Sequence, residues 1–166
     1  MILITRPLAQ TANLKMLLEA SDIEYAFFPT FEVKKIRSEV LKQHYDVIIF
    51  ISVNAVSFAE DYFNKIFTGV HKVFAVGPIT AKRLIDKDIK VDCFPKFNAS
   101  SLKLLAMQEC SELIDKKILI VRGRGGSETL KDNLGKFNQV DYLEVYERVP
   151  CEFSSLHAES IKVFLD

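Results

Sequence analysis

The feature that most constrains the fold is the regular alternation of short apolar runs with segments of helical periodicity. The apolar runs are nearly continuous stretches of β-branched and aromatic residues, and they do not alternate strictly between polar and apolar positions. Strands that are covered on both faces, as in parallel sheets, have this pattern. The predicted strands are 1–5, 24–28, 46–51, 72–76, 89–93, 117–121 and 141–147.

The segments between these runs carry apolar residues at helical spacing, as Leu14, Leu17 and Leu18 do in the first of them. Strands that alternate with helices at this rhythm imply right-handed βαβ crossovers. The sequence therefore predicts an α/β fold built on parallel sheets. The predicted helices are 8–20, 54–66, 79–86, 100–113 and 127–136.

The predicted elements divide unevenly along the chain. Residues 46–147 contain five predicted strands with four helices between them, which makes a complete flavodoxin-like or Rossmann-like unit. Residues 1–34 supply only a strand, a helix and a strand before the polar stretch KKIRSE. The run IKVFLD at 161–166 is expected to open a further strand. This pattern indicates a fragment whose next βα units are missing.

Composition excludes several classes of function. The 22 basic and 22 acidic residues cancel, so no global field attracts nucleic acid or a membrane. No apolar run approaches the roughly 20 residues that cross a bilayer. The N-terminal segment lacks the pattern of a signal peptide, and a cytoplasmic location is expected.

Cysteine and histidine positions do not suggest a metal site. The cysteines are odd in number and widely spaced, which argues against a disulfide framework or a metal cluster. The histidines have no ligand-like spacing and are expected at the surface. These residues are Cys93, Cys110, Cys151, His44, His71 and His157.

Small, polar or basic residues follow four of the predicted strands. Ligands of open α/β sheets bind at the carboxyl ends of the strands, where backbone N–H groups and helix N-termini favour anions. Taken singly, Ser52 and Asn54 could be plain helix caps, Gly77 ordinary turn punctuation and Arg6 a surface charge. Together, the strand exits predict one rim that binds an anion. The candidate contacts are Thr5, Arg6, Ser52, Asn54, Gly77, Thr80, Arg122, Gly123, Gly125 and Gly126.

The stretch ILIVRGRGGSETL at 118–130 is the strongest single anion-site candidate. It is not a P-loop, because no GK[ST] follows, and Glu128 stands where a dinucleotide fingerprint needs its third glycine. Arg122 and Arg124 add local positive charge suited to a carboxylate or a phosphate. Glu128 would complement the dipole of the following helix.

Six stretches in order resemble the uroporphyrinogen-III synthase family. They are ILITRP (2–7), FPTFEV (28–33), DVIIFISVNAV (46–56), VFAVGPITAKRL (73–84), ILIVRGRGGSETL (118–130) and EVYERV (144–149). The resemblance implies two flavodoxin-like or Rossmann-like parallel-sheet domains that are joined by a two-strand ladder, with the first domain incomplete. The implied parts are a discontinuous first domain at 1–25 and 151–166, a second domain at 35–145, and crossover strands at 26–34 and 143–150.

The resemblance also implies a reaction. Members of the family are cofactor-independent lyases that cyclise hydroxymethylbilane to uroporphyrinogen III, inverting ring D and losing water. The substrate is a linear tetrapyrrole polycarboxylate, so the expected anion is a carboxylate. The tyrosine proposed as the family's proton donor falls on Tyr146, for which a purely structural role is the alternative. Ile51 stands where the family commonly has threonine, which removes one hydroxyl from the expected cleft.

The implied partners are the linear tetrapyrrole and, as a candidate, the upstream hydroxymethylbilane synthase, with no nucleic acid and no membrane. A monomer is expected for the full-length protein. Because one wall of the cleft would be missing, the chain itself is expected to turn over poorly. A flavodoxin-like module that binds an anion or a nucleotide, and a non-catalytic pseudo-enzyme, are the other two interpretations.

Overall fold

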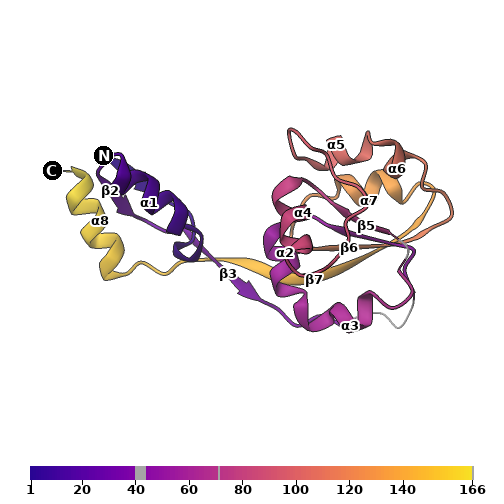
Figure 1. Ribbon diagram of the computed structural model, residues 1–166. Coiled ribbons are helices and arrows are strands. Elements are labelled where there is room, and N and C mark those ends of the chain that lie inside the picture. The colour runs from indigo at the N-terminus through magenta and orange to yellow at the C-terminus, as the bar shows by residue number, and fades with distance from the viewer. Residues whose placement is uncertain (40–43, 71, 166) are drawn as a thin grey trace. The chain divides into compact units, whose positions relative to one another are not determined.

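The chain folds as two compact units, which a computed structural model describes for residues 1–39, 44–70 and 72–165 (Figure 1). Unit 1 comprises Met1–Lys34 and Arg148–Asp166, and unit 2 comprises Lys35–Glu147. We propose that these units correspond to the two expected domains, whose boundaries stay a prediction. His71 lies outside the described residues.

A five-stranded sheet has the order β3-β7-β6-β4-β5, and unit 2 contains its strands β4, β5 and β6 together with most of β7. The strands are β3 (Phe31–Lys35), β4 (Val47–Phe50), β5 (Lys72–Ala75), β6 (Lys117–Gly123) and β7 (Gln139–Pro150). The pairs β7·β6, β6·β4 and β4·β5 are parallel. Their carboxyl ends therefore meet at one edge of the sheet, as the sequence predicts.

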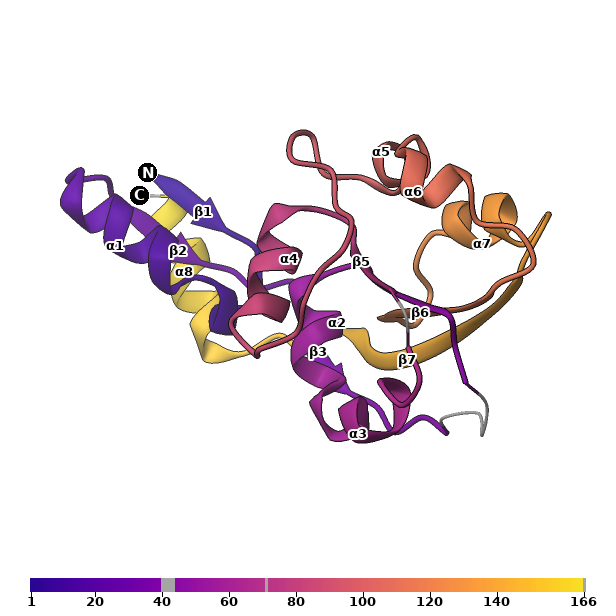
Figure 2. The ribbon, with the colours of Figure 1, turned by 45° about the vertical axis from the view of Figure 1, so that its right-hand side comes forward.

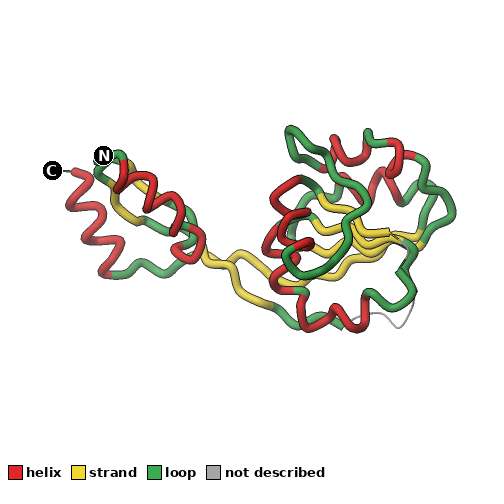
Figure 3. Tube along the Cα trace, viewed as in Figure 1, coloured by secondary structure: helices red, strands yellow, loops and turns green. Residues whose placement is uncertain are grey.

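Helices cover both faces of this sheet (Figures 2 and 3). On one face α2 (Val53–Phe58) packs against α4 (Pro78–Ile85), and on the other α5 (Ser101–Leu105) packs against α6 (Gln108–Ser111) and α7 (Thr129–Leu134). Every residue of β4 is buried. Val47 and Ile49 belong to the core under α5 and α7, while Phe50 points to the opposite face and stacks on Phe67. Burial on both faces explains why β4 has no polar residue.

Two predicted helices are interrupted. The segment predicted as 54–66 forms α2, a 3₁₀ turn η2 (Glu60–Tyr62) and α3 (Phe63–Ile66). The segment predicted as 100–113 breaks between α5 and α6, where Met107 adopts an extended backbone with ψ of 142°. Apolar periodicity predicts which face of these segments is buried. A short break in the helix that keeps the same residues buried does not change the periodicity, so the sequence does not reveal it.

Unit 1 contains two parallel strands, β1 (Ile2–Ile4) and β2 (Tyr25–Phe27). The connection between them holds η1 (Leu8–Gln10) and α1 (Ala12–Ala20), and α8 (Ser155–Leu165) packs against β2. Ser160 Oγ of α8 donates a hydrogen bond to the carbonyl of Phe27. The last segment of the chain is thereby attached to the first strands.

The prediction of a strand at 161–166 is wrong, because α8 includes this run through Leu165. A short apolar run does not by itself distinguish a strand from a buried helix. The helix begins beside Ser154, whose Oγ and N–H both lie within hydrogen-bond distance of His157 Nδ1. Buried His157 and Ser160, three residues apart, turn the same face inward.

The prediction that His157 lies at the surface is also wrong, since its side chain is 5% exposed. The backbone N–H of Ser154 can only donate, so it donates to Nδ1 at 3.1 Å. Nε2 therefore carries the ring proton and donates it to the carbonyl of Pro29 at 2.8 Å. His157 thus ties α8 to the segment after β2. His44 is exposed, as predicted.

The predicted strand at 89–93 is reduced to one parallel bridge between Cys93 and Phe74. Two backbone bonds accompany the bridge, from Asp92 N–H to the Val73 carbonyl at 2.8 Å and from Ala75 N–H to the Cys93 carbonyl at 3.0 Å, and the Asp92 carboxylate accepts the N–H of Val73 at 2.9 Å. Pro95, two residues after Cys93, has no N–H to donate. Pairing along this edge therefore ends after one bridge.

The three cysteines are free thiols. Burial raises the pKa of Cys93 to about 11 and that of Cys110 to about 12, so both are expected to react slowly. Cys151 is half-buried. None of the helices in the described part of the chain combines the length and the apolar character that a bilayer crossing requires.

Candidate functional site

A pair of hydroxyl groups joins the exit of β4 to strand β7. Ser52 follows β4, Tyr146 belongs to β7, and their hydroxyl oxygens lie 3.1 Å apart although the residues are 94 positions apart in the chain. Strand β6 lies between β7 and β4 in the sheet. The tyrosine side chain must therefore reach across the end of β6 to meet the serine.

Gly123, the last residue of β6, makes this crossing possible. Arg122 pairs with Glu144, but Gly123 pairs with Tyr146, so the register shifts between the two β6 residues and Val145 is skipped. Such bulges redirect side chains at the ends of strands. A Cβ on Gly123 would lie only 2.4 Å from Cε2 of the tyrosine ring. The ring thus occupies the place where any other residue would carry a side chain.

Tyr146 is largely buried, with 6% of its surface exposed. Its ring packs beside Phe58 of α2, with 5.9 Å between ring centroids. Phe58 was not predicted as part of the site. Its place in the apolar spacing of 54–66 shows only that it lies on the inner face of a helix. The ring of Tyr146 is held between Phe58 and Gly123, so the position of its hydroxyl is well defined.

Ser52 has two functions in the structure. Its Oγ accepts the N–H of Ala55 at 3.0 Å and so caps the N-terminus of α2, which agrees with the simpler interpretation of this residue. The same oxygen meets Tyr146. Asn54 lies half-buried in the first turn of α2.

Gly77 and Thr80 stand at the exit of β5 and the start of α4. A Cβ on Gly77 would lie 2.2 Å from the Cβ of Ala99, so this glycine allows the segment before α5 to pack closely. Thr80 is 5% exposed. Close packing and burial give both residues a structural role, and their contact with a substrate stays a prediction that this packing disfavours.

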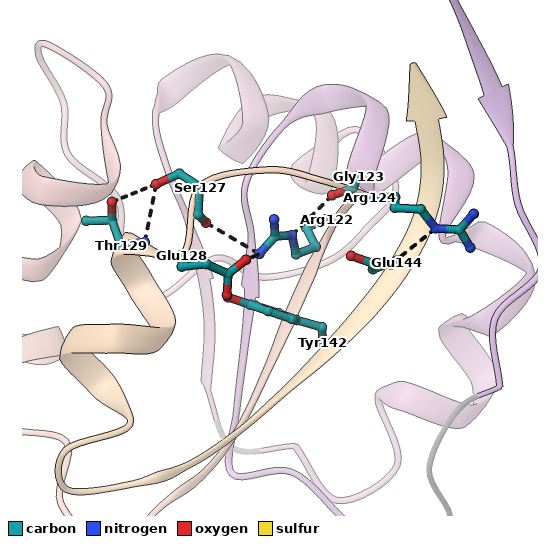
Figure 4. A network of polar contacts seen from close by, with 8 residues as sticks. All are labelled: Arg122, Gly123, Arg124, Ser127, Glu128, Thr129, Tyr142 and Glu144. Carbon is teal, nitrogen blue, oxygen red and sulfur yellow. Dashed lines mark hydrogen bonds and ion pairs between the residues drawn. The ribbon is translucent and has the colours of Figure 1, made fainter. Parts of the chain in front are cut away.

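Arg122 is a buried residue at the centre of a network of polar contacts (Figure 4). Its side chain is 1% exposed, and its guanidinium lies 4.2 Å from the ring centre of Tyr142. The guanidinium donates to the carbonyl of Gly123 at 3.1 Å and to that of Ser127 at 3.4 Å. It also pairs with the carboxylate of Glu128 at 2.9 Å.

The glycine-rich turn therefore holds a cation that belongs to the chain itself, where the sequence predicts an anion. Two of its carbonyl oxygens face the Arg122 guanidinium, and a Cβ on Gly126 would lie 2.8 Å from Arg122 Nη2. Gly125 has a φ of +71°, which glycine adopts readily. The predicted contact of Arg122 with an external carboxylate stays untested, and its burial and pairing disfavour it.

The charges around Arg122 shift the ionisation of its neighbours. Tyr142 donates to Glu128 at 2.6 Å. This bond, together with Arg122, holds the pKa of Glu128 below its ordinary value, although desolvation acts in the opposite direction. Burial, followed by the bond to Glu128, raises the pKa of Tyr142 to about 12. Tyr142 gave no signal in the sequence beyond its place in an apolar strand.

Arg124 differs from Arg122 although only one residue separates them. Its side chain is 56% exposed and pairs with Glu147 at 3.0 Å and with Glu144 at 3.5 Å. The backbone N–H of Arg124 donates to the carbonyl of Tyr146 at 2.8 Å. The turn is thereby attached to β7 next to the tyrosine.

The remaining predicted contacts belong to unit 1. Thr5 and Arg6 follow β1 and are exposed. The Thr5 carbonyl accepts the N–H of Thr30 at 3.1 Å, which joins the exits of β1 and β2. A pocket of about 260 Å³ opens beside these exits. It is lined by Pro7, Leu8, Ala9, Pro29, Phe31, Glu32, Val33 and Cys151.

The structure thus brings Ser52, Gly123 and Tyr146 together in unit 2 and places Thr5 and Arg6 in unit 1. Within the described residues, no group of three or more His, Cys, Asp and Glu side chains is arranged to hold a metal ion. The chemistry that unit 2 offers is a pair of hydroxyl groups at the edge where the parallel strands β4 and β6 end.

Curated proteins of known function resemble the chain in sequence. It is 27% identical over 114 residues to uroporphyrinogen-III synthase of Proteus mirabilis, covering 66% of this chain and 57% of that protein. It is 29% identical over 112 residues to uroporphyrinogen-III synthase of Escherichia coli K12, covering 65% and 46%. The chain therefore spans about half the length of these relatives.

Solved structures show the same fold. A mutant uroporphyrinogen III synthase of the extremely thermophilic bacterium Thermus thermophilus superimposes with a TM-score of 0.66 at 16% identity, covering 90% of this chain and 63% of that one. The synthetase of Helicobacter pylori 26695 gives a TM-score of 0.62 at 17% identity, covering 96% and 66%. The model of the HEM4 family, described as uroporphyrinogen-III synthase HemD, matches residues 12–162. Because this match spans most of the sequence, the chain belongs to the uroporphyrinogen-III synthase family.

Proposed function

We propose that the protein cyclises hydroxymethylbilane to uroporphyrinogen III, with inversion of ring D and loss of water. The match of residues 12–162 to the family carries this proposal. The position of the Tyr146 hydroxyl, at the carboxyl ends of parallel strands and 3.1 Å from Ser52, supports the assignment of roles to residues.

In the proposed reaction Tyr146 acts as the general acid. Its hydroxyl proton passes to the terminal hydroxyl of the substrate, the C–O bond breaks with its electron pair on oxygen, and water leaves. Electrons of the neighbouring pyrrole nitrogen produce an azafulvenium cation, and the tyrosine remains as phenolate. Ring D attacks this cation through its substituted α-carbon and forms a spiro intermediate. The bond from that carbon to its original bridging methylene then breaks, and the methylene, now an azafulvenium cation on the neighbouring ring, bonds to the free α-carbon of ring D, which inverts the ring. The proton that this carbon releases returns to the phenolate as ring D regains aromaticity. Atoms and charge balance over the cycle without a cofactor.

The rest of catalysis is proposed to come from positioning the two ends of the substrate. Thr5 and Arg6, which are exposed at the exit of β1, are the proposed contacts for substrate carboxylates. Arg122 is proposed to act indirectly, by holding the turn that carries Gly123 and Arg124. A nucleotide-binding function is less well supported, because the turn that would hold the phosphates surrounds Arg122 instead.

The test is to add enzymatically generated hydroxymethylbilane to the full chain and to separate the uroporphyrin isomers after oxidation. Isomer III is expected, and formation of isomer I alone, as in the spontaneous reaction, would contradict the proposal. Tyr146→Phe is expected to lower the rate while the protein still folds. Tyr25→Phe removes a hydroxyl whose hydrogen bond to Glu19 lies at the surface of unit 1, and it is the matched control. Equal rates for both variants would remove Tyr146 from the mechanism.

We also propose a cytoplasmic monomer that receives its substrate from hydroxymethylbilane synthase. Its mass in solution, measured by light scattering, is expected to be that of one chain. If the substrate is handed over directly, the two proteins are expected to bind each other in a titration of purified components. A mass of two chains, or the absence of any binding, would contradict the corresponding part of the proposal.

A further inference from the structure

We propose that Ser52 and Gly123 are positioning residues for Tyr146. Ser52 donates its hydroxyl proton to Tyr146 Oη, and Gly123 leaves the space in which the tyrosine ring can reach that serine. The catalytic consequence rests on the proposed function, whereas the geometric part does not.

The hydrogen-bond capacity of Ser52 restricts the arrangement. A serine hydroxyl has one proton and two lone pairs. One lone pair accepts the N–H of Ala55 at 3.0 Å, which also fixes the oxygen at the start of α2. Towards Tyr146, at 3.1 Å, the serine either accepts the phenolic proton or donates its own.

Only the second arrangement suits a general acid. If Tyr146 donated its proton to Ser52, that proton would not be available to the leaving hydroxyl. If Ser52 donates, the phenolic proton is free to point towards the substrate. The serine proton then also stabilises the oxygen as it becomes phenolate, and a donor held in place before the reaction needs no reorganisation. Ser52 would therefore act through Tyr146, without a need to touch the substrate.

Gly123 sets the position of the ring. A Cβ at this residue would lie 2.4, 2.5 and 2.9 Å from Cε2, Cζ and Cδ2 of Tyr146. Distances this short require the ring to move, and half-buried Phe58 packs beside it. Any side chain at 123 is thus expected to separate the tyrosine hydroxyl from Ser52.

The first test measures stability and is independent of activity. Gly123→Ala is expected to lower the Tm of the chain by about 3–10 °C, as an overpacked core residue does in a protein of this size. In a Tyr146→Ala background the space is free, so the same glycine substitution is expected to have little effect. In a Ser52→Ala background the ring is still present, so the full loss of Tm is expected. Equal losses in all three backgrounds would overturn the role of Gly123.

The second test reports on Tyr146 itself, by NMR of the chain with ¹³Cζ-labelled tyrosine. The Tyr146 resonance is identified by its absence from Tyr146→Phe. It is expected to shift in Ser52→Asp and in Gly123→Ala, and to stay near its original position in Ser52→Thr. Aspartate is a good N-cap but cannot donate when ionised, so it separates the cap from the hydrogen bond. An unmoved resonance in Ser52→Asp would overturn the role of Ser52.

Kinetics connect these positions to the reaction. Ser52→Asp is expected to lower kcat by at least as much as Tyr146→Phe does, whereas Ser52→Thr, which keeps the donor, is expected to keep the rate. The double variant Ser52→Asp/Tyr146→Phe should be no slower than Tyr146→Phe alone, because both act on one step. Multiplied losses would show that Ser52 acts separately. If the unaltered chain forms only isomer I, the proposed function fails, while the stability and NMR tests still decide the positioning roles.

Discussion

Replacing Arg122 by methionine tests whether the glycine-rich turn depends on its own buried cation. The methionine occupies a similar volume but donates no hydrogen bond, so the carbonyls of Gly123 and Ser127 lose their guanidinium partner. Each unsatisfied acceptor costs on the order of 1 kcal/mol, and loss of the contact with the Tyr142 ring costs about 1 kcal/mol more. Glu128 is 54% exposed and is expected to regain water. The expected loss in the free energy of unfolding is about 3 kcal/mol, or roughly 6–12 °C in Tm.

Arg124→Met is the matched control, since it removes the same group from the same turn. The Arg124 side chain is 56% exposed and its ion pairs are at the surface, so a loss of about 0–1 kcal/mol is expected. Urea denaturation followed by far-UV circular dichroism gives both values, with unchanged slopes as the check for two-state unfolding. Equal losses for the two variants would refute the structural role of Arg122.

Three further predictions concern Glu128, Tyr142 and His157. The pKa of Glu128 lies below its ordinary 4.5, so the stability that this carboxylate contributes is complete above pH 4.5 and is lost as the pH falls. The free energy of unfolding in urea should therefore fall less steeply below pH 4.5 for Glu128→Gln than for the unaltered chain, and parallel curves would contradict this. Absorbance titration at 295 nm should show Tyr142 ionising near pH 12, and the stability that its protonated form contributes should be lost between pH 10 and 12. A titration curve that is the same in Tyr142→Phe would refute the assignment. His157→Leu should lower the free energy of unfolding by about 2–3 kcal/mol, because the hydrogen bonds to Pro29 and Ser154 are removed. His44→Leu, at an exposed position, should lower it by about 0.5 kcal/mol or less. Similar losses for both variants in urea denaturation would contradict the role of His157 in holding α8.

The central strands of unit 2 could be predicted because burial on both faces leaves continuous apolar runs. Strands β4 and β6 lie inside the predicted segments or extend them by two residues. The prediction of a full strand at 89–93 was wrong, because this edge segment forms a single bridge, at Cys93. A short apolar run does not show how many of its residues pair with a neighbouring strand. The run at 161–166 failed because its helix is stabilised by His157 and Ser160, which contact residues more than 120 positions away.

The candidate site divides in the same way. The exits of parallel strands could be identified in the sequence, since they follow from strand order and turn chemistry, and Ser52 and Tyr146 were both among the predicted residues. Their contact could not be identified, because it depends on a register shift in β7 and on the absence of a side chain at Gly123. Arg122 and Arg124 have the same chemistry and nearly the same position in the chain. Only the three-dimensional structure shows that one is buried and the other exposed.

The sequence by itself determined the α/β class, the parallel sheet, the shared edge at which its strands end and, through its motifs, the family. These properties depend on local periodicity and on residue types that each segment carries alone. The tertiary structure decided that the glycine-rich turn surrounds the chain's own Arg122, and that Tyr146 crosses β6 to reach Ser52. Both depend on which residues, distant in the sequence, are buried together. A buried charge needs polar partners close by, and close packing places an aromatic ring in the space where a glycine has no side chain.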